Sequence, residues 1–217
     1  MVMSNTDNVI EVKDVNLIIG KEHILHDISV SFEKGKIHGL VGRNGSGKTM
    51  LMKCICGFVR YTDGEIRVDG LRIGKDIDFP KNIGIIIETP GFIPYYSGYK
   101  NLKLLAGLKN NIGRKEIEET IELVGLDPKL KKSVRKYSLG MRQRLGMAQA
   151  IMENPEILVL DEPMNGLDKQ GVNDMRELLM KLKEQGKTII LASHSTEDIE
   201  ILCDTVHEMD KGVISEM

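Results

Sequence analysis

Hydrophobic and polar residues alternate in two runs near the start of the 217-residue chain, at 9–19 and 24–32, with Gly20-Lys21 between them. Alternation with a period of two is typical of strands that bury one face, so these runs predict a pair of antiparallel strands. Two shorter strands are predicted at 65–68 and 83–87. The first part of the chain is therefore expected to contain an antiparallel β unit.

The pattern changes between about residues 90 and 154, where apolar residues recur every three or four positions. This spacing places them on one face of a helix. It predicts helices at 98–108, 114–124 and 139–152. Because strand patterns lie on both sides of this segment, the sequence predicts an inserted α-helical subdomain.

Two continuous apolar runs follow at 157–160 and 188–192, separated by an amphipathic segment at 172–184. Short apolar runs of this kind are typical of parallel strands buried on both faces and joined by a helix. A similar run at 37–41 precedes a glycine-rich turn and a predicted helix at 48–56. The sequence therefore predicts an α/β fold with a parallel sheet at its centre.

The turn after residue 41 fits the pattern G-x-x-x-x-G-K-[ST], in the strand-to-helix context that a phosphate-binding loop requires. It consists of Gly42, Arg43, Asn44, Gly45, Ser46, Gly47, Lys48 and Thr49. Its glycines let backbone N–H groups point toward phosphates, and the helix N-terminus adds a favourable dipole. Lys48 is expected to neutralise the β- and γ-phosphates, and Thr49 to ligate Mg²⁺. The alternative is a glycine-rich turn without a ligand.

Two carboxylates, Asp161 and Glu162, end the apolar run at 157–160, where parallel α/β sheets bind their ligands. We expect Asp161 to hold Mg²⁺ and Glu162 to orient, or accept a proton from, the water that attacks the γ-phosphate. His194 follows the run at 188–192 at the same edge and is expected to bind the γ-phosphate. The alternatives are an acidic residue that caps a turn and a packed structural histidine.

Composition limits the class of protein. The chain is 41% hydrophobic and 29% charged with a formal net charge of -2, which is ordinary for a globular protein and argues against a nucleic-acid partner. No stretch approaches the roughly 18 apolar residues that span a bilayer, and the polar start at 1–8 lacks a signal-peptide core. Cys54, Cys56 and Cys203 show no metal-ligand spacing and indicate reduced thiols. We expect a cytoplasmic protein.

The segment 137–145 (YSLGMRQRL) resembles the LSGGQ signature of ABC ATPases, and it lies about 90 residues after Lys48, as in that family. The resemblance implies that Ser138 and the backbone N–H of Gly140 contact the γ-phosphate of ATP held by a second subunit. It therefore implies a head-to-tail dimer, either a homodimer or a heterodimer. Residues 165–168 (NGLD) resemble the D-loop, which crosses that dimer interface and would place Asp168 near the partner's phosphate loop. The alternative for Ser138 and for Asp168 is an ordinary helix cap, and at Asp168 both roles are compatible.

Tyr137, Leu139 and Met141 stand where Leu, Gly and Gln are usual in the signature, and two further positions depart from the family pattern. Glu88 stands where a glutamine is usual, and its carboxylate is expected to reach Mg²⁺ or the attacking water while adding negative charge beside the γ-phosphate. The alternative is an ordinary surface loop residue. Ile19 stands where an aromatic residue usually stacks on adenine, so apolar contact is expected to replace part of the stacking.

The resemblance extends from about Val9 to the end of the chain. It implies a P-loop NTPase (RecA-like) core with an antiparallel β subdomain and an inserted α-helical subdomain, so that residues 1–88 and 155–217 form the catalytic core and 89–154 the helical subdomain. It further implies a Mg²⁺-dependent ATPase of an ABC transporter, bound to a separate transmembrane permease at the inner face of the cell membrane.

Glu88, with residues 90–92 (PGF) and 99–102 (YKNL), is similar to the ATPase subunits of bacitracin-resistance and lantibiotic-immunity exporters. This similarity implies export of an antimicrobial peptide or of a lipid-linked target. The main alternative is a soluble ABC ATPase that acts on ribosomes or nucleic acid, although such proteins usually join two cassettes or insert a long coiled coil. A small-molecule kinase and a nucleotide-binding module without turnover are further alternatives.

Overall fold

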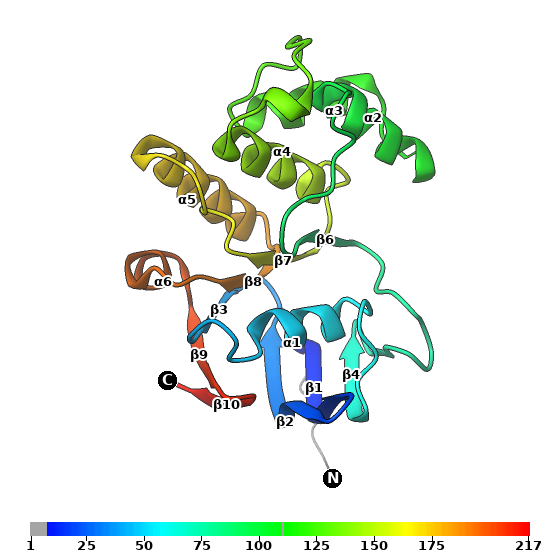
Figure 1. Ribbon diagram of the computed structural model, residues 1–217, viewed down its shortest axis with the longest axis vertical. Helices are drawn as coiled ribbons and strands as arrows, with labels where there is room; N and C mark the ends of the chain where they lie inside the picture. The colour runs from blue at the N-terminus through cyan, green and yellow to red at the C-terminus, as the bar shows by residue number, and fades with distance from the viewer. Residues whose placement is uncertain (1–7, 110) are drawn as a thin grey trace.

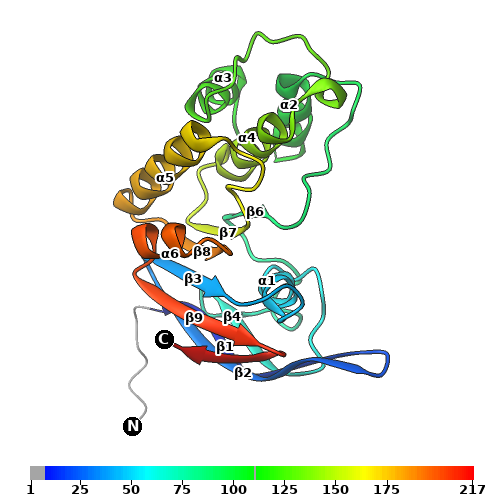
Figure 2. The same ribbon diagram turned by 60° about the vertical axis from the view of Figure 1, so that its left-hand side comes forward.

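The computed structural model describes residues 8–109 and 111–217, so residues 1–7 of the polar start lie outside the described part. The described residues form two β-sheets, six α-helices and one short 3-10 helix. An antiparallel sheet lies at one end of the elongated molecule, three helices lie at the other, and the second sheet crosses the middle (Figure 1). Figure 2 shows the same division from another side.

The smaller sheet has the strand order β2-β1-β4-β5, and neighbouring strands are antiparallel. Its strands are β1 (Asn8–Ile19), β2 (Glu22–Glu33), β4 (Asp63–Val68) and β5 (Leu71–Arg72). The register pairs Ile10 with Phe32 and Val12 with Val30, which places the predicted apolar positions of the two long strands opposite one another. This confirms the predicted antiparallel pair.

The larger sheet has the strand order β10-β9-β3-β8-β7-β6, in which all neighbours are parallel except β10 and β9. Its strands are β3 (Ile37–Val41), β6 (Ile83–Ile86), β7 (Ile157–Asp161), β8 (Thr188–Ala192), β9 (Thr205–Asp210) and β10 (Val213–Glu216). The carboxyl ends of β3, β7 and β8 therefore meet at one edge, where the motif residues follow.

The helices connect these strands and cover the sheet. They are α1 (Lys48–Ile55), α2 (Gly98–Lys109), α3 (Arg114–Leu123), α4 (Leu139–Ile151), α5 (Lys169–Glu184) and α6 (Thr196–Leu202), with a 3-10 turn at Val134–Lys136. The three helices predicted between β6 and β7 are present as α2, α3 and α4. Of the described helices, none combines the length and the apolar character that crossing a bilayer requires.

Side-chain caps fix where α4 and α5 begin. The Oγ of Ser138 accepts a hydrogen bond from the N–H of Met141 at the start of α4, and the Oδ1 of Asp168 accepts one from Gly171 at the start of α5. Each cap satisfies a backbone donor that has no partner within the helix. Because Asp168 caps it, α5 begins at Lys169, three residues before the apolar pattern at 172–184 indicated.

The larger sheet is hydrophobic on both faces. Leu158 and Leu160 pack with α4 and α5 in one core, whereas Val159 and Ile190 pack with α1 and the antiparallel sheet in a second core. This alternation explains why the central strands appear in the sequence as continuous apolar runs. The predicted α/β fold, a P-loop NTPase core with an antiparallel β subdomain and a helical insertion, is confirmed.

Candidate functional site

The glycine-rich turn between β3 and α1 is closely packed. Gly42, Gly45 and Gly47 have φ values of 141°, 81° and 109°, which side chains rarely allow. A Cβ atom on Gly42 would lie 2.2 Å from the carbonyl oxygen of Met209, so β9 leaves no room for one. The turn therefore requires glycine for backbone conformation and for space, as a loop that wraps around phosphates does.

Two polar groups in this loop are suited to a phosphate. The Lys48 side chain is largely buried, and its Nζ donates to the carbonyl oxygens of Gly42 at 2.6 Å and of Arg43 at 3.2 Å. The Oγ of Ser46 is buried and has no hydrogen-bond partner among the described residues. A cation held by the loop itself and an unused hydroxyl donor fit the triphosphate of a nucleotide.

Thr49 and Asp161 come together from different elements. The Oγ1 of Thr49, in the first turn of α1, donates to the Oδ2 of Asp161, at the end of β7, over 2.7 Å. A hydroxyl and a carboxylate are oxygen ligands of the kind that Mg²⁺ prefers beside substrate phosphates. These two residues fit a Mg²⁺ ion, and their role as its ligands stays a prediction.

Glu162 and His194 form a direct pair. The Nδ1 of His194 lies 2.8 Å from the Oε2 of Glu162, and the side chains are 74% and 27% exposed. The Glu162 backbone has φ 51°, and its carbonyl accepts a hydrogen bond from the Nε2 of Gln143 over 3.2 Å. The sequence placed both side chains at the same sheet edge but did not predict the bond between them, because it depends on how β7 and β8 lie side by side.

Glu88 lies just after β6 with φ 60°, and its Oε1 accepts from the Nζ of Lys53 over 2.5 Å. The Lys53 side chain is 22% exposed and that of Glu88 is 64% exposed. Lys53 lies one helical turn after Thr49 on α1, so the same face of this helix contacts the carboxylates of Asp161 and Glu88. Sequence reasoning missed Lys53, and its spacing of four residues from Thr49 was the available signal.

A cavity of about 600 Å³ brings most of these residues together. Its lining includes the predicted Asn44, Gly45, Ser46, Gly47, Lys48, Thr49, Glu88, Asp161 and Glu162, and also Ile24, Met50, Leu139, Arg142, Gln143 and Asn165. Gly42, Arg43 and His194 line a second hollow of about 910 Å³. The phosphate loop thus lines both the cavity and the second hollow.

Ile19, Ser138 and Gly140 do not line this cavity, although Leu139, Arg142 and Gln143 of the signature segment do. Ile19 ends β1 beside the hairpin turn and is 49% exposed, whereas Ile24 of β2 is the apolar residue that lines the cavity. Ser138 is exposed at the start of α4, and a Cβ on Gly140 would lie 3.0 Å from the carbonyl oxygen of Gly166. The structure does not bring Ser138 or Gly140 to the phosphate loop of its own chain.

A phosphate loop on a parallel sheet, beside an acidic strand end and a helical insertion, defines a P-loop NTPase of the ATP-binding cassette class. The family model described as "ABC transporter" matches residues 25–165, and the chain belongs to this family. It is the ATP-binding subunit of an ABC transporter and hydrolyses ATP with Mg²⁺. Subunits of this kind dimerise and pair with permease subunits.

Similar proteins agree with this assignment. The uncharacterized ABC transporter ATP-binding protein YybJ of Bacillus subtilis (strain 168) is 46% identical over 94% of this chain and 94% of its own length. The bacitracin transport ATP-binding protein BcrA of Enterococcus faecalis is 42% identical over 96% of this chain and 68% of its own. A solved structure, an ATP binding subunit of an ABC transporter, is 25% identical with a TM-score of 0.85, covering 96% and 89% of the two chains. These findings confirm the transporter hypothesis over the soluble alternative.

Proposed function

We propose specific roles for the residues around the cavity. Lys48 and the loop N–H groups bind the phosphates, Thr49 and Asp161 hold Mg²⁺, and Glu162 orients and deprotonates the attacking water. His194 fixes the Glu162 carboxylate and contacts the γ-phosphate. The observation that supports these roles is the pair of contacts at the strand ends, Thr49–Asp161 at 2.7 Å and Glu162–His194 at 2.8 Å.

The bound Mg²⁺ would neutralise charge on the β- and γ-phosphates during phosphoryl transfer. Glu162 would accept a proton from water as the water oxygen bonds to the γ-phosphorus and the bond to the β-phosphate oxygen breaks, which releases ADP and inorganic phosphate. The ring of His194 can hold Glu162 in position because it bonds one of the two carboxylate oxygens and leaves the other to accept the proton.

We also propose a homodimer as the active unit. One chain contains both a phosphate loop and a signature segment, but Ser138 and Gly140 do not line the cavity with that loop. A two-fold arrangement of two identical chains would complete both sites at once. In the same proposal, residues 1–88 and 155–217 act as the catalytic core, and 89–154 as the helical subdomain.

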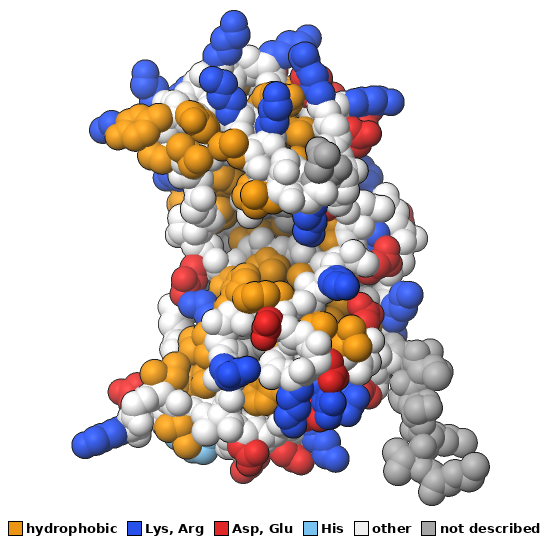
Figure 3. Space-filling view, turned by 90° about the vertical axis from the view of Figure 1, so that its right-hand side faces the viewer, with side chains coloured by type: hydrophobic (Ala, Val, Ile, Leu, Met, Phe, Trp, Pro, Cys, Tyr) orange, Lys and Arg blue, Asp and Glu red, His pale blue; other side chains and the backbone are white. Residues whose placement is uncertain are grey.

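A hydrophobic groove on the surface is suited to bind the permease. The groove has a volume of about 850 Å³ between the core and α2, and its lining includes Phe58, Phe79, Leu105 and Leu108. Figure 3 shows hydrophobic side chains gathered at the waist of this face. Phe58, Phe79 and Leu108 are 54%, 60% and 81% exposed, which is typical of an interaction surface. We propose that the permease occupies this groove and holds the subunit at the inner face of the membrane.

We propose that the transporter exports an antimicrobial peptide or its lipid-linked target. The similarity to a bacitracin transport ATP-binding protein and the glutamate at position 88 support this substrate class. The test is expression of the chain with the membrane protein that co-purifies with it in detergent and ATP. We expect bacitracin or lantibiotic tolerance to rise, and to fall back in Glu162→Gln. Recovery of no membrane partner would contradict the transport proposal, and unchanged tolerance would contradict the substrate class.

A further inference from the structure

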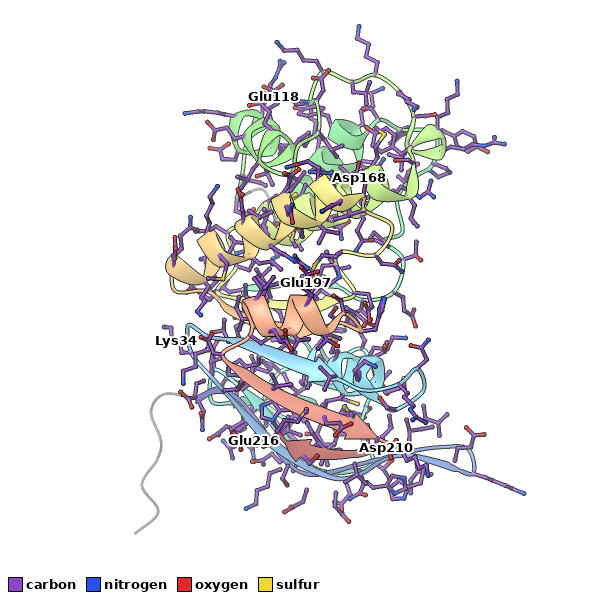
Figure 4. All side chains as sticks on the ribbon, turned by 90° about the vertical axis from the view of Figure 1, so that its left-hand side faces the viewer. Lys34, Glu118, Asp168, Glu197, Asp210 and Glu216 are labelled. Atoms are coloured by element: carbon purple, nitrogen blue, oxygen red, sulfur yellow. The ribbon has the colours of Figure 1, made fainter. Side chains whose placement is uncertain are left out.

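A buried ion pair joins α5 to α6 behind the His194 loop. The Nε and Nη2 of Arg176 donate to the Oδ1 of Asp198 over 2.8 and 2.5 Å, and the two side chains are 13% and 5% exposed. Nη2 also donates to the Oε2 of Glu197 over 2.9 Å. Figure 4 shows Glu197 on α6 beside α5, the helix that begins after Asp168. A buried ion pair is weak evidence for stability, so its geometry is the more informative property.

Asp198 is bonded to the residues on both sides of His194. Its Oδ2 accepts from the Oγ of Ser193 over 3.3 Å, and its backbone N–H donates to the Oγ of Ser195 over 3.3 Å. The N–H of Ser195 in turn donates to the Oγ of Ser193 over 3.1 Å. The Ser193 hydroxyl therefore links the Ser195 N–H to the Asp198 carboxylate, which Arg176 holds from the opposite side, and Ser195 is also bonded to the Asp198 N–H.

His194 itself has little else to fix its position. Its side chain is 74% exposed, and its bond to Glu162 is its one side-chain hydrogen bond among the described residues. An exposed ring with one bond takes its position from the backbone that supports it. We propose that Arg176 and Asp198 are positioning residues for His194, and that they act through Ser193 and Ser195. The proposal rests on the catalytic role of His194 proposed above.

The position of Arg176 gives this network a second connection. Arg176 lies on the helix that Asp168 caps, so one rigid element joins the loop after β7 to the loop after β8. A shift of the segment at 165–168 would therefore move the support of His194 as well. The network supplies a physical route between the expected dimer contact and the catalytic edge within one chain.

The test compares Arg176→Met and Ser193→Ala with Lys187→Met in the full-length protein. Lys187 is also buried and ion-paired, through Glu156, but it lies at the opposite end of β8 from His194, so it controls for loss of a buried cation. We expect Arg176→Met and Ser193→Ala to lower kcat about tenfold while the Kd for MgATP stays within about twofold, because only the alignment of His194 changes. Arg176→Lys should restore part of the rate. Ser193→Ala removes a link without leaving a buried charge, so it decides the outcome if Arg176→Met does not fold.

A double-variant comparison separates positioning from a general structural effect. In a His194→Ala background, Arg176→Met and Ser193→Ala should lower kcat no further than about twofold, since the group they position is gone. The same tenfold loss in that background, or an equal loss in Lys187→Met, would overturn the inference. If His194→Ala lowers kcat but Ser193→Ala does not, the inference alone fails. If His194→Ala leaves kcat unchanged, the proposed role of His194 fails with it.

Discussion

At the scale of single residues, the catalytic edge is organised by pairs. Thr49 is bonded to Asp161, Glu162 to His194, and Lys53 to Glu88. Each pair joins residues that are at least 30 positions apart in the sequence, so each depends on the sheet order that brings the strand ends together. Substitutions at one member should therefore change the chemistry at this edge without changing the fold.

The first prediction concerns Glu162. Glu162→Gln removes the proton acceptor but keeps the side-chain size, so we expect phosphate release to fall about a hundredfold or more while ATP binding persists. The ATP-bound dimer should then accumulate, and size-exclusion chromatography with MgATP measures it. Glu184 is exposed at the end of α5, so Glu184→Gln is the control. It should leave phosphate release and the amount of ATP-bound dimer unchanged. Unaltered turnover in Glu162→Gln would rule out this role.

The second prediction concerns Glu88. If its carboxylate contributes to the metal site, Glu88→Gln should raise the Mg²⁺ concentration for half-maximal phosphate release by about tenfold, because an amide oxygen is a weaker ligand. Titration of free Mg²⁺ at saturating ATP measures this. The matched control is Glu153→Gln, which also loses a lysine partner, Lys109, at 2.5 Å. An unchanged Mg²⁺ requirement would make Glu88 a surface loop residue.

The sequence predicted the identity of the edge residues better than their contacts. Lys48, Thr49, Asp161 and Glu162 could be placed at this edge because each motif has a fixed spacing within one strand-to-helix or strand-to-loop turn. The Glu162–His194 bond could not be predicted, because it depends on the packing of separate strands. Ile24 shows the same limit, since which apolar residue of a hairpin reaches the cavity depends on how the two sheets pack.

At the scale of elements, buried histidines lie where the two sheets meet. His38 of β3 and His207 of β9 pack against the ring of Phe32, with centroid distances of 5.2 and 5.7 Å. Burial lowers the pKa of both imidazoles, and the neighbouring His207 lowers the pKa of His38 further. His38 is bonded through both ring nitrogens, to Thr205 and to the Glu33 carbonyl. The folded state therefore favours the neutral form of both imidazole rings.

The third prediction follows from these lowered pKa values. Below about pH 6.5 the unfolded chain binds protons at these positions that the folded chain resists, so their contribution to stability is complete above that pH and is lost as the pH falls below it. We expect the urea midpoint to fall between pH 7.5 and 5.5. Between these pH values, the urea midpoint of His207→Gln should fall less than that of the unmodified chain. It should also fall less than that of His23→Gln, which replaces an exposed histidine. An equal fall of the urea midpoint in all three proteins would show that His207 does not contribute to this pH dependence.

Secondary structure was predictable where one periodicity continues for several turns or strand positions. The long antiparallel strands and α2, α3 and α4 fall within a residue or two of their predicted bounds. The elements after His194, namely α6, β9 and β10, were not predicted because they have only 7, 6 and 4 residues, too few for a periodicity to stand out. The start of α5 was missed because its cap at Asp168, rather than its apolar face, sets the boundary.

At the scale of the whole molecule, Ser138 and Gly140 do not line the cavity with the phosphate loop of their own chain, and they are proposed to serve the loop of the partner. This arrangement gives the fourth prediction. Ser138→Arg adds bulk and charge at an exposed position. We expect turnover to fall about a hundredfold, because the γ-phosphate held by the partner loses its contact with Ser138. The Kd for MgATP should not change, because the phosphate loop of the same chain is intact.

Mixed dimers test this further. A chain with Ser138→Arg combined with one with Lys48→Ala should regain at most one working site per dimer, because each site needs an intact loop from one chain and an intact signature from the other. Phosphate release that recovers partly on mixing supports action across the dimer. A loss of MgATP binding in Ser138→Arg alone would instead place the effect within one chain.

The last prediction concerns the groove at the waist, which connects ATP hydrolysis to a membrane partner. The groove is lined by β6 and by α2, and Glu88 to Gly91 follow β6 directly, so an occupant of the groove would touch the segment that also borders the catalytic cavity. Leu108 is 81% exposed on the α2 side of it. A charge there would have to be buried against an apolar partner at a large energetic cost.

We therefore expect Leu108→Glu to abolish co-purification with the permease in detergent while phosphate release by the isolated subunit stays within about twofold, because Leu108 does not line the catalytic cavity. Leu123→Glu is the matched control, since Leu123 is 55% exposed on α3 and does not line the groove. Retention of the permease by Leu108→Glu would place the docking surface elsewhere. Equal loss in both variants would point to a general effect of negative charge on the helical end.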